Sequence, residues 1–156
     1  MINLTVSELD KLTLNVDSGS IPIITPDEYC IDGSFVGKTL RGYHFSNQIE
    51  SPSLFSRMFE NCKSLELFEN FPEVDTIPSY FAAGCSNLKT IQLGAKLTKI
   101  DHYAFDGDEA LELSELPSAL ETLGQHAFSN CKKCTFNRFP DSIKSLGSYA
   151  LWAATE

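Results

Sequence analysis

The chain has 156 residues, and its 21 acidic residues outnumber its 12 lysines and arginines, which gives a formal net charge of -9. This length suits one domain with a continuous apolar core. The acidic balance argues against nucleic acid as a partner, because phosphate binding depends on lysine and arginine, and it disfavours anionic membranes for the same reason. No run of apolar residues is long enough to suggest membrane insertion.

The N-terminus lacks the basic start and the apolar run of a secretory signal. This feature predicts a cytoplasmic protein, with a virion component or a piece cut from a larger protein as the alternatives. Five cysteines are present, an odd number that favours a reducing compartment over a disulfide framework.

Residues 1–53 do not share the repeat found later in the chain, and we interpret them as an N-terminal cap. Alternating apolar and polar residues predict two strands, over 2–6 and 12–16. The apolar stretch 21–24 contains Pro22, which removes a backbone donor and suggests a sheet edge. This cap is therefore expected to be β-rich, and Cys30 within it has no assigned partner.

From Leu54 the sequence repeats at a fixed period of 23 residues. The units start at Leu54, Ile77, Ile100 and Leu123, and a partial fifth unit starts at Leu146. In the clearest units, Ala-Phe or Ala-Leu stands four and five places after the aliphatic start. A second apolar column lies eleven places after each start, at Leu65, Leu88, Leu111 and Cys134. A unit of this length buries its apolar side only against its neighbours, so the units are expected to stack as a solenoid.

The consensus apolar-Gly-x-x-Ala-Phe-x-Asn/Gly-Cys-x-x-Leu, followed by Leu-Pro, resembles the BspA-like leucine-rich repeats of bacterial surface proteins, protist proteins and some bacteriophage proteins. The resemblance implies an α/β solenoid with parallel strands and short helical turns. We accordingly divide the chain into a β-rich cap over 1–53 and a solenoid of four units plus a partial fifth over 54–156. Family members are mostly adhesion and protein-recognition modules, which is the class of function that the resemblance implies.

Two segments of each unit have distinct patterns. The segment after the start, such as 103–105, is short and is followed by glycine or asparagine, which predicts a single helical turn on the convex side. The later segment, such as 88–93, nearly alternates apolar and polar residues, which predicts the parallel strand of the concave side.

Three cysteines, Cys62, Cys85 and Cys131, share one offset of the repeat, and we interpret them as a buried ladder of thiols. Cys131 and Cys134 have the C-x-x-C spacing of zinc and redox sites. Cys134, however, stands where the other units carry leucine, so both thiols should point into the core. We therefore expect neither a metal nor a cofactor.

No motif of a hydrolase, a P-loop protein or a dinucleotide-binding enzyme is present, so we predict no catalytic residues. His102 and His126 occupy adjacent rather than equal offsets, which argues against a shared metal site. One unit carries a group of carboxylates that we interpret as a solvated acidic face: Asp106, Asp108, Glu109, Glu112 and Glu115.

Partner binding is predicted at the outward positions of the later segments, where the stacked units would hold side chains in a rigid array. Two polar rows contribute Lys89, Gln92, Glu112, Glu115 and Arg138. The row between them is more apolar than solvent exposure would predict. It contains Leu67, Thr90, Leu113 and Phe136.

Two explanations of this apolar row compete. Leu113 and Phe136 either turn inward through a register shift, in place of the core role of Ile91, or form an exposed stripe that meets a partner. The register shift is favoured, because Ser114 and Asn137 occupy the position of Ile91 in their units.

Trp152 has no counterpart in the other units. It is expected either to cap the last coil or to be an exposed anchor for another subunit or a partner. The function predicted is a noncatalytic protein–protein interaction module with an unidentified protein partner and possible self-association through the solenoid ends. The alternatives are a bacteriophage structural or accessory protein, which decorates a virion or binds a host protein, and a fragment of a bacterial surface adhesin.

Overall fold

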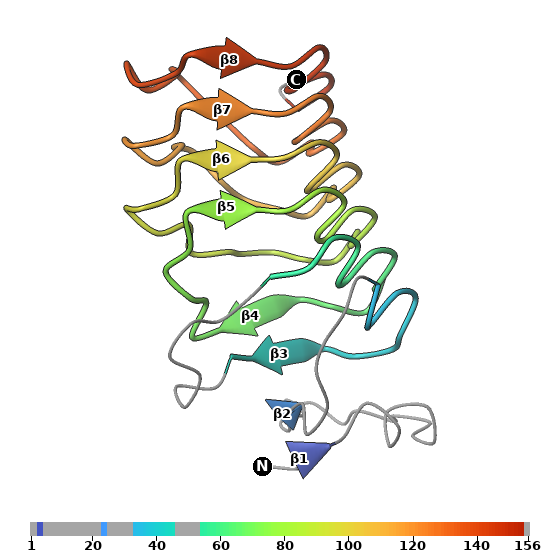
Figure 1. Cartoon of the computed structure of the whole chain (residues 1–156). Helices are drawn as coiled ribbons and strands as arrows, with labels where there is room; N and C mark the ends of the chain where they lie inside the picture. Colours follow the sequence, from blue (N-terminus) through green and yellow to red (C-terminus); the bar gives the residue numbers. More distant parts are fainter. Residues whose placement is uncertain (1–2, 5–22, 25–32, 46–53, 155–156) are drawn as a thin grey trace.

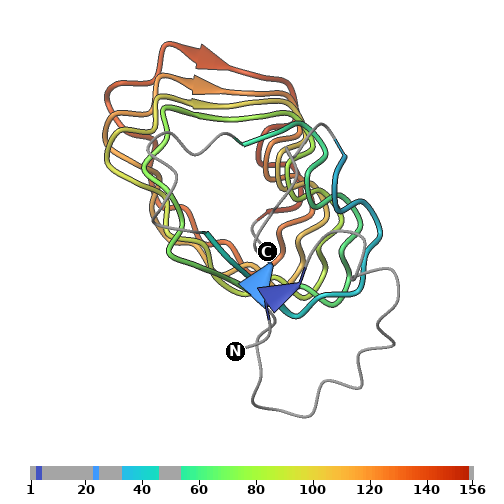
Figure 2. The same ribbon diagram turned by 60° about the horizontal axis from the view of Figure 1, so that its bottom comes forward.

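The chain winds into a stack of coils around one apolar core (Figures 1 and 2). The computed structural model describes residues 3–4, 23–24, 33–45 and 54–154. We name the coils by repeat unit: coil I is 54–76, coil II 77–99, coil III 100–122, coil IV 123–145, and coil V starts at 146. The described residues form eight short strands and no helix. None of them therefore forms a helix with the length and hydropathy needed to span a bilayer.

Four two-residue strands at the coil boundaries form a parallel sheet in chain order (Figure 1). These are β5 (Thr76–Ile77), β6 (Lys99–Ile100), β7 (Thr122–Leu123) and β8 (Ser145–Leu146). Ile77 pairs with Ile100, which pairs in turn with Leu123, and all three side chains are fully buried. The constant period is thus an in-register ladder, and the predicted solenoid with parallel strands is confirmed.

The sheet does not lie in the later segment, where the sequence pattern had placed it. Only the first later segment forms a strand, β4 (Leu67–Glu69), which pairs in parallel with β3 (Gly42–His44) and has a single bridge to Thr90. Farther along, single backbone hydrogen bonds link the later segments, such as Glu112 N to Lys89 O at 2.9 Å. An alternating pattern shows which residues of a segment face the core. Both sides of a coil contribute residues to the core, so this pattern does not show which side forms the sheet.

The segment after each coil start is a run of β-turns and not the predicted helical turn. In coil III, Tyr103 N donates to Gln125 O of the next coil at 2.8 Å. Asp106 N, in contrast, donates to Tyr103 O within its own coil at 3.3 Å. Because alternate N–H groups bond to the next coil, the i to i−4 hydrogen bonds of an α-helix cannot form.

Each turn segment contains a non-glycine residue in the left-handed region. At Arg57, Tyr80, Tyr103, His126 and Tyr149, φ lies between 54° and 57°. This backbone conformation costs roughly 1–2 kcal/mol per residue. Within coils I to IV the next-coil hydrogen bond donated by each of these residues offsets that cost.

Five fully buried phenylalanines form the spine of the core: Phe35, Phe59, Phe81, Phe105 and Phe128. Phe81 stands one place earlier in its unit than Phe105 and Phe128 do in theirs. Its ring is turned 85° from that of Phe59 and 78° from that of Phe105. The rings of Phe105 and Phe128 are stacked, with 13° between their planes. Rotation of one ring thus accommodates the irregular unit.

The stack begins before Leu54. Phe35 N donates to Met58 O at 2.9 Å and Gly37 N to Glu60 O at 2.8 Å, so residues 33–45 form a further coil. These hydrogen bonds span 23 residues, whereas the equivalent bonds between later coils, such as Tyr103 N to Gln125 O, span 22, and Gly42 pairs with Leu67 at a spacing of 25. This coil is therefore out of phase with the 23-residue period, which is why the sequence pattern places it in the cap. Elsewhere in the assigned cap, β1 (Asn3–Leu4) pairs in parallel with β2 (Ile23–Ile24). Cys30 and the strand predicted over 12–16 lie outside the described residues.

Candidate interaction surface

The later segments of coils I to IV lie side by side and form one face of the solenoid. We call this surface, residues 66–69, 89–92, 112–115 and 135–138, the lateral face. Hydrogen bonds from Lys89 N to Glu66 O (2.8 Å) and from Thr135 N to Leu113 O (2.8 Å) join neighbouring segments. The lateral face brings together nine of the ten predicted binding residues: Leu67, Lys89, Thr90, Gln92, Glu112, Leu113, Glu115, Phe136 and Arg138.

Charges of alternating sign lie along and beside the lateral face. Glu66 lies between Arg41 and Lys89, with N–O distances of 3.5 and 3.4 Å. The hydrogen bond from Lys89 holds the pKa of the Glu66 carboxyl below its usual value. One coil farther on, Lys133 lies 3.5 Å from Glu112. Exposed pairs of this kind contribute little to stability, so a partner can exchange them for its own charges at small cost.

Leu113 and Phe136 are half-buried and pack against the core. The Phe136 ring centroid lies 5.2 Å from that of Phe128, in an edge-to-face arrangement. Ser114 and Asn137, at the position of the buried Ile91, are exposed. Both side chains therefore pack inward, and neither forms a fully exposed apolar stripe. The backbone register changes only after Leu113.

The backbone shows where the shift occurs. Glu112 N donates to Lys89 O, but Thr135 N, at the equivalent place in coil IV, donates to Leu113 O instead of Glu112 O. The hydrogen-bonded row therefore advances by one residue between coils III and IV. A continuous strand ladder cannot pass through this step.

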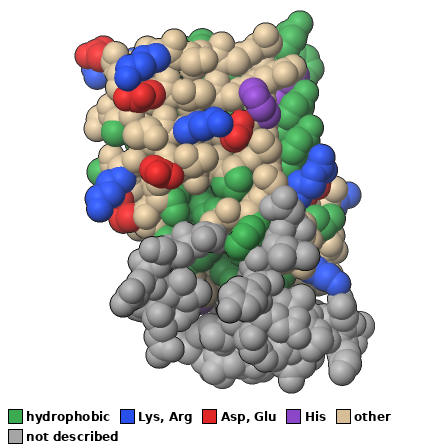
Figure 3. Space-filling model, viewed as in Figure 1, with side chains coloured by type: hydrophobic (Ala, Val, Ile, Leu, Met, Phe, Trp, Pro, Cys, Tyr) green, Lys and Arg blue, Asp and Glu red, His purple; other side chains and the backbone are tan. Residues whose placement is uncertain are grey.

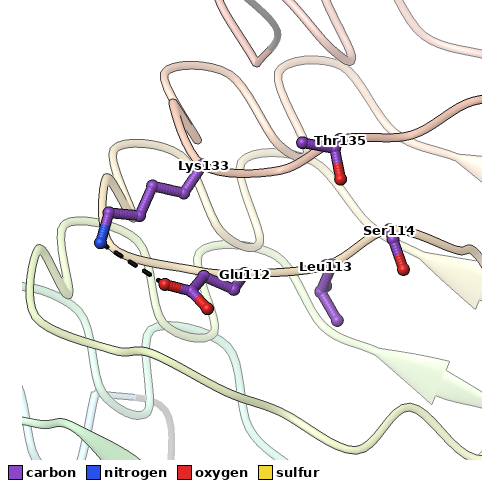
Figure 4. A pocket seen from close by; sticks show the side chains of 5 residues that line it. All are labelled: Glu112, Leu113, Ser114, Lys133 and Thr135. Atoms are coloured by element: carbon purple, nitrogen blue, oxygen red, sulfur yellow. Dashed lines mark hydrogen bonds and ion pairs between the residues drawn. The ribbon is translucent and has the colours of Figure 1, made fainter.

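A shallow cleft of about 400 Å³ lies at the register shift. Its lining comes from Glu112, Leu113 and Ser114 of coil III and from Lys133 and Thr135 of coil IV. In Figure 4 the Lys133 side chain reaches toward the carboxylate of Glu112 on the preceding coil, so an ion pair bounds the cleft. Thr135 belongs to the same outward row of the repeat as Lys89 and Glu112. Sequence reasoning did not select Ser114 or Lys133 as binding residues, because only the step between coils places them around a common space.

The remaining predicted residues differ in exposure. Thr90, Gln92, Glu115 and Arg138 are exposed, whereas Leu67 is half-buried within β4. Trp152 does not belong to the lateral face, because it lies in the turn segment of coil V. Its side chain is 55% exposed, so it is not buried as a cap over the last coil.

The face that carries β5–β8 differs from the turn edge beside it (Figure 3). Over the strands, side chains of both charges are interspersed, including the pairs Lys99–Asp101 at 3.0 Å and Lys144–Glu121 at 2.9 Å. Hydrophobic side chains gather along the edge formed by the turn segments, next to histidine.

The cysteines do not form an open site. Cys62, Cys85 and Cys131 are fully buried, and each thiol donates to a backbone carbonyl of the preceding coil at 2.9–3.0 Å. The predicted thiol ladder is therefore confirmed. Burial raises the pKa of Cys62 to about 12, and contact with Cys134 together with burial raises the pKa of Cys131. Among the described residues, no three Cys, His, Asp or Glu side chains are placed to hold a metal ion.

The prediction of a wholly solvated acidic face is wrong for Asp108, which is buried. It occupies the offset at which three other units carry cysteine, and it is fully buried. Its Oδ1 accepts the N–H of Cys85 at 2.9 Å, whereas Oδ2 has no hydrogen-bond partner among the described residues. Burial raises the pKa of Asp108 well above its usual value. The other four carboxylates of this group are half-buried or exposed, because their offsets point away from the core.

Comparison with known proteins identifies similar repeats. The family model described as a BspA type leucine rich repeat region matches residues 31–155 in six copies. A leucine-rich repeat protein from Eubacterium ventriosum has a TM-score of 0.67 and 27% identity, and the match covers 80% of this chain and 33% of that one. A leucine-rich repeat protein from Bacteroides ovatus has a TM-score of 0.68 and 25% identity, with 84% and 34% covered. This chain thus spans about a third of the length of both proteins. No curated protein gives a significant match.

Proposed function

The chain belongs to the BspA-type leucine-rich repeat family, and from this premise we propose that it is a noncatalytic module that binds another protein through its lateral face. The observation that carries the proposal is the alternation of exposed charges across coils whose backbones are hydrogen-bonded to one another. A rigid periodic array of this kind suits a partner that contacts several coils at once.

The shape of the cleft supports a protein partner over a small molecule. Small-molecule sites are usually enclosed and mainly apolar. The cleft between coils III and IV is shallow, and four of its five lining residues are polar or charged. It fits the role of a local depression within a larger contact, in which a partner's side chain would rest beside Leu113.

A charge-exchange variant tests this proposal. Glu112→Lys combined with Lys133→Glu preserves an ion pair within the chain but reverses the charges that face a partner. The matched control, Glu121→Lys with Lys144→Glu, makes the same exchange on the strand face, where the pair is 2.9 Å apart. Proteins retained by the immobilised wild-type chain would be identified by mass spectrometry, purified, and measured against all three chains by biolayer interferometry.

We expect the lateral-face exchange to weaken binding about tenfold, because like charges placed opposite each other oppose association. The strand-face exchange should leave the affinity within about twofold of wild type, since pairs outside a contact contribute little. Equal loss in both variants, or no loss in either, would exclude the lateral face as the binding surface.

A further inference from the structure

Four charged side chains of alternating sign form a row across successive coils, along the lateral face and the coil before it. We call them the charge row: Arg41, Glu66, Lys89 and Glu112. Glu66 N donates to Arg41 O at 2.7 Å, and Lys89 N donates to Glu66 O at 2.8 Å. Glu112 N donates in turn to Lys89 O at 2.9 Å. This unbroken hydrogen bonding holds the four positions at an even spacing of about 4.8 Å, the usual distance between paired segments.

The order of charges in this row is complementary to its own reverse. Along the chain the signs are plus, minus, plus and minus, so a second row that runs in the opposite direction presents minus, plus, minus and plus. A two-fold axis that lies in the plane between two lateral faces, and passes between coils I and II, relates the rows in this way. It places Arg41 opposite Glu112 of a second copy, and Glu66 opposite Lys89 of that copy.

The neighbouring outward row is compatible with the same axis. It contains His44, Glu69, Gln92 and Glu115. His44 and Glu69 are aligned by the pairing of β3 with β4. The axis places His44 opposite Glu115 of the second copy and Glu69 opposite Gln92 of that copy. No two carboxylates of this row therefore face each other across the contact.

We propose that the lateral face binds a second copy of this chain in an antiparallel, two-fold symmetric dimer. This inference rests on the proposed function, because it names the partner of the same surface. Within one chain, Arg41 and Lys89 already flank Glu66, at 3.5 and 3.4 Å. The dimer adds an opposite charge across the interface to each member of the charge row, and a network of charges stabilises more than isolated exposed pairs do.

The charge row selects this orientation and this register over others. A parallel copy in register, or an antiparallel copy displaced by one coil, places like charges opposite each other and opposes association. Other displacements leave part of the row unpaired. The row itself is neutral, although the chain carries a net charge of -9. Two copies repel each other overall, so their association requires local pairing of this kind.

Segregation of the charges tests this proposal. Glu66→Lys with Glu112→Lys makes the row wholly positive, and Arg41→Glu with Lys89→Glu makes it wholly negative. Sedimentation equilibrium of the full chain would measure self-association of the wild type, of each variant and of their equimolar mixture. We expect the wild type to dimerise with a dissociation constant on the order of 100 µM, typical of a small polar contact. Each variant alone should associate about tenfold more weakly, and the mixture should associate at least as tightly as the wild type.

The matched controls make the same changes of net charge on the strand face. They are Asp101→Lys with Glu121→Lys, and Lys99→Glu with Lys144→Glu, which alter the two ion pairs found there. The self-association of each control should stay within about threefold of wild type, because exposed pairs outside a contact contribute little. Circular dichroism of every variant would show whether the fold is intact.

Several results would overturn this proposal. They are a wild-type chain that remains monomeric at about 0.5 mM, well above the expected dissociation constant, segregated variants that dimerise as tightly as the wild type, and a mixture of folded variants that does not associate. Equal weakening in the strand-face controls would assign the effect to net charge instead of the charge row.

The proposed function has a separate readout, which is the affinity for other proteins in the exchange of Glu112 and Lys133. A monomeric wild type whose affinity for those proteins falls in that exchange would overturn the dimer and leave the proposed function intact. A wild-type dimer that the segregated variants abolish would support the inference whatever other proteins the chain retains.

Discussion

Replacing Asp108 with cysteine is expected to raise the free energy of unfolding by about 1–3 kcal/mol at neutral pH, the range for removing an unsatisfied buried polar group. Asp108 is fully buried, and its Oδ2 has no hydrogen-bond partner among the described residues. Cysteine fits the site, because Cys62, Cys85 and Cys131 fill the same offset and donate their thiols to the preceding coil. Urea unfolding followed by circular dichroism would measure the gain.

The gain should depend on pH in a defined direction. Burial raises the pKa of Asp108, so the folded chain holds this proton more tightly than the unfolded chain does. The stabilising effect of the protonated acid is therefore complete below the ordinary carboxyl pKa and is lost as pH rises through the raised value. The difference in unfolding free energy between wild type and Asp108→Cys should be larger at pH 8 than at pH 5.

Asp108→Asn is the matched control, because it preserves the shape of the side chain and removes its titration. We expect this variant to lose the part of the pH dependence that Asp108 supplies while it retains an acceptor for the N–H of Cys85. A wild-type chain that is more stable than Asp108→Cys at pH 8 would contradict our account. Such a result would mean that the buried carboxylate has a stabilising partner.

Gly124→Ala is expected to lower the free energy of unfolding by about 3 kcal/mol, the upper part of the usual range for overpacking. A Cβ at this position would lie 2.5 Å from the carbonyl carbon of Asp101 and 2.6 Å from the nitrogen of His102. Both atoms belong to the backbone of coil III and cannot move as a side chain would. The neighbouring hydrogen bond from Gly124 N to Ile100 O, at 2.8 Å, should weaken when the coils separate.

Gly37→Ala provides the control for this substitution. Gly37 has a φ of +66°, but a Cβ there would meet nothing within 4 Å. The free energy of unfolding of this variant should fall by only about 1 kcal/mol, which is the cost of placing alanine in the left-handed region. Gly124 does not lie in the left-handed region, so a larger loss in Gly124→Ala than in Gly37→Ala comes from contact with coil III and not from that backbone strain. The urea midpoints of both variants give this comparison. If Gly124→Ala is no less stable than Gly37→Ala, coils III and IV have more freedom to separate than their packing indicates.

The repeat made the buried positions predictable. The columns at Leu65, Leu88 and Leu111 and at the three shared-offset cysteines are all fully buried, because a constant period places equal offsets above one another. The same reasoning located the two units in which an apolar core residue is missing, because Ser114 and Asn137 stand at the position of Ile91. The burial of Asp108 could also be predicted from its offset in the repeat, although its charge suggests exposure.

Other features depended on contacts that the pattern does not encode. The sheet lies at the coil starts because those short segments keep one register through four strands, and a two-residue strand is too short to show a period of its own. A column of stacked planar side chains along the turn segments combines different residue types, so only the left-handed backbone and the ring distances reveal it. Its members are Arg57, Tyr80, Tyr103, His126 and Tyr149. The coil at 33–45 was missed because it is out of phase with the 23-residue period.

The sequence by itself determined that this chain stacks repeated units, where each unit faces the core, and which residues line the later segments. Those properties follow from a constant period, which is local information repeated along the chain. Only the tertiary structure decided which side of a coil forms the sheet, where a register step opens a cleft, and which side chains of different types stack along the turn segments. These depend on hydrogen bonds and distances between residues about 23 positions apart, and identical spacing in the sequence is compatible with more than one such arrangement.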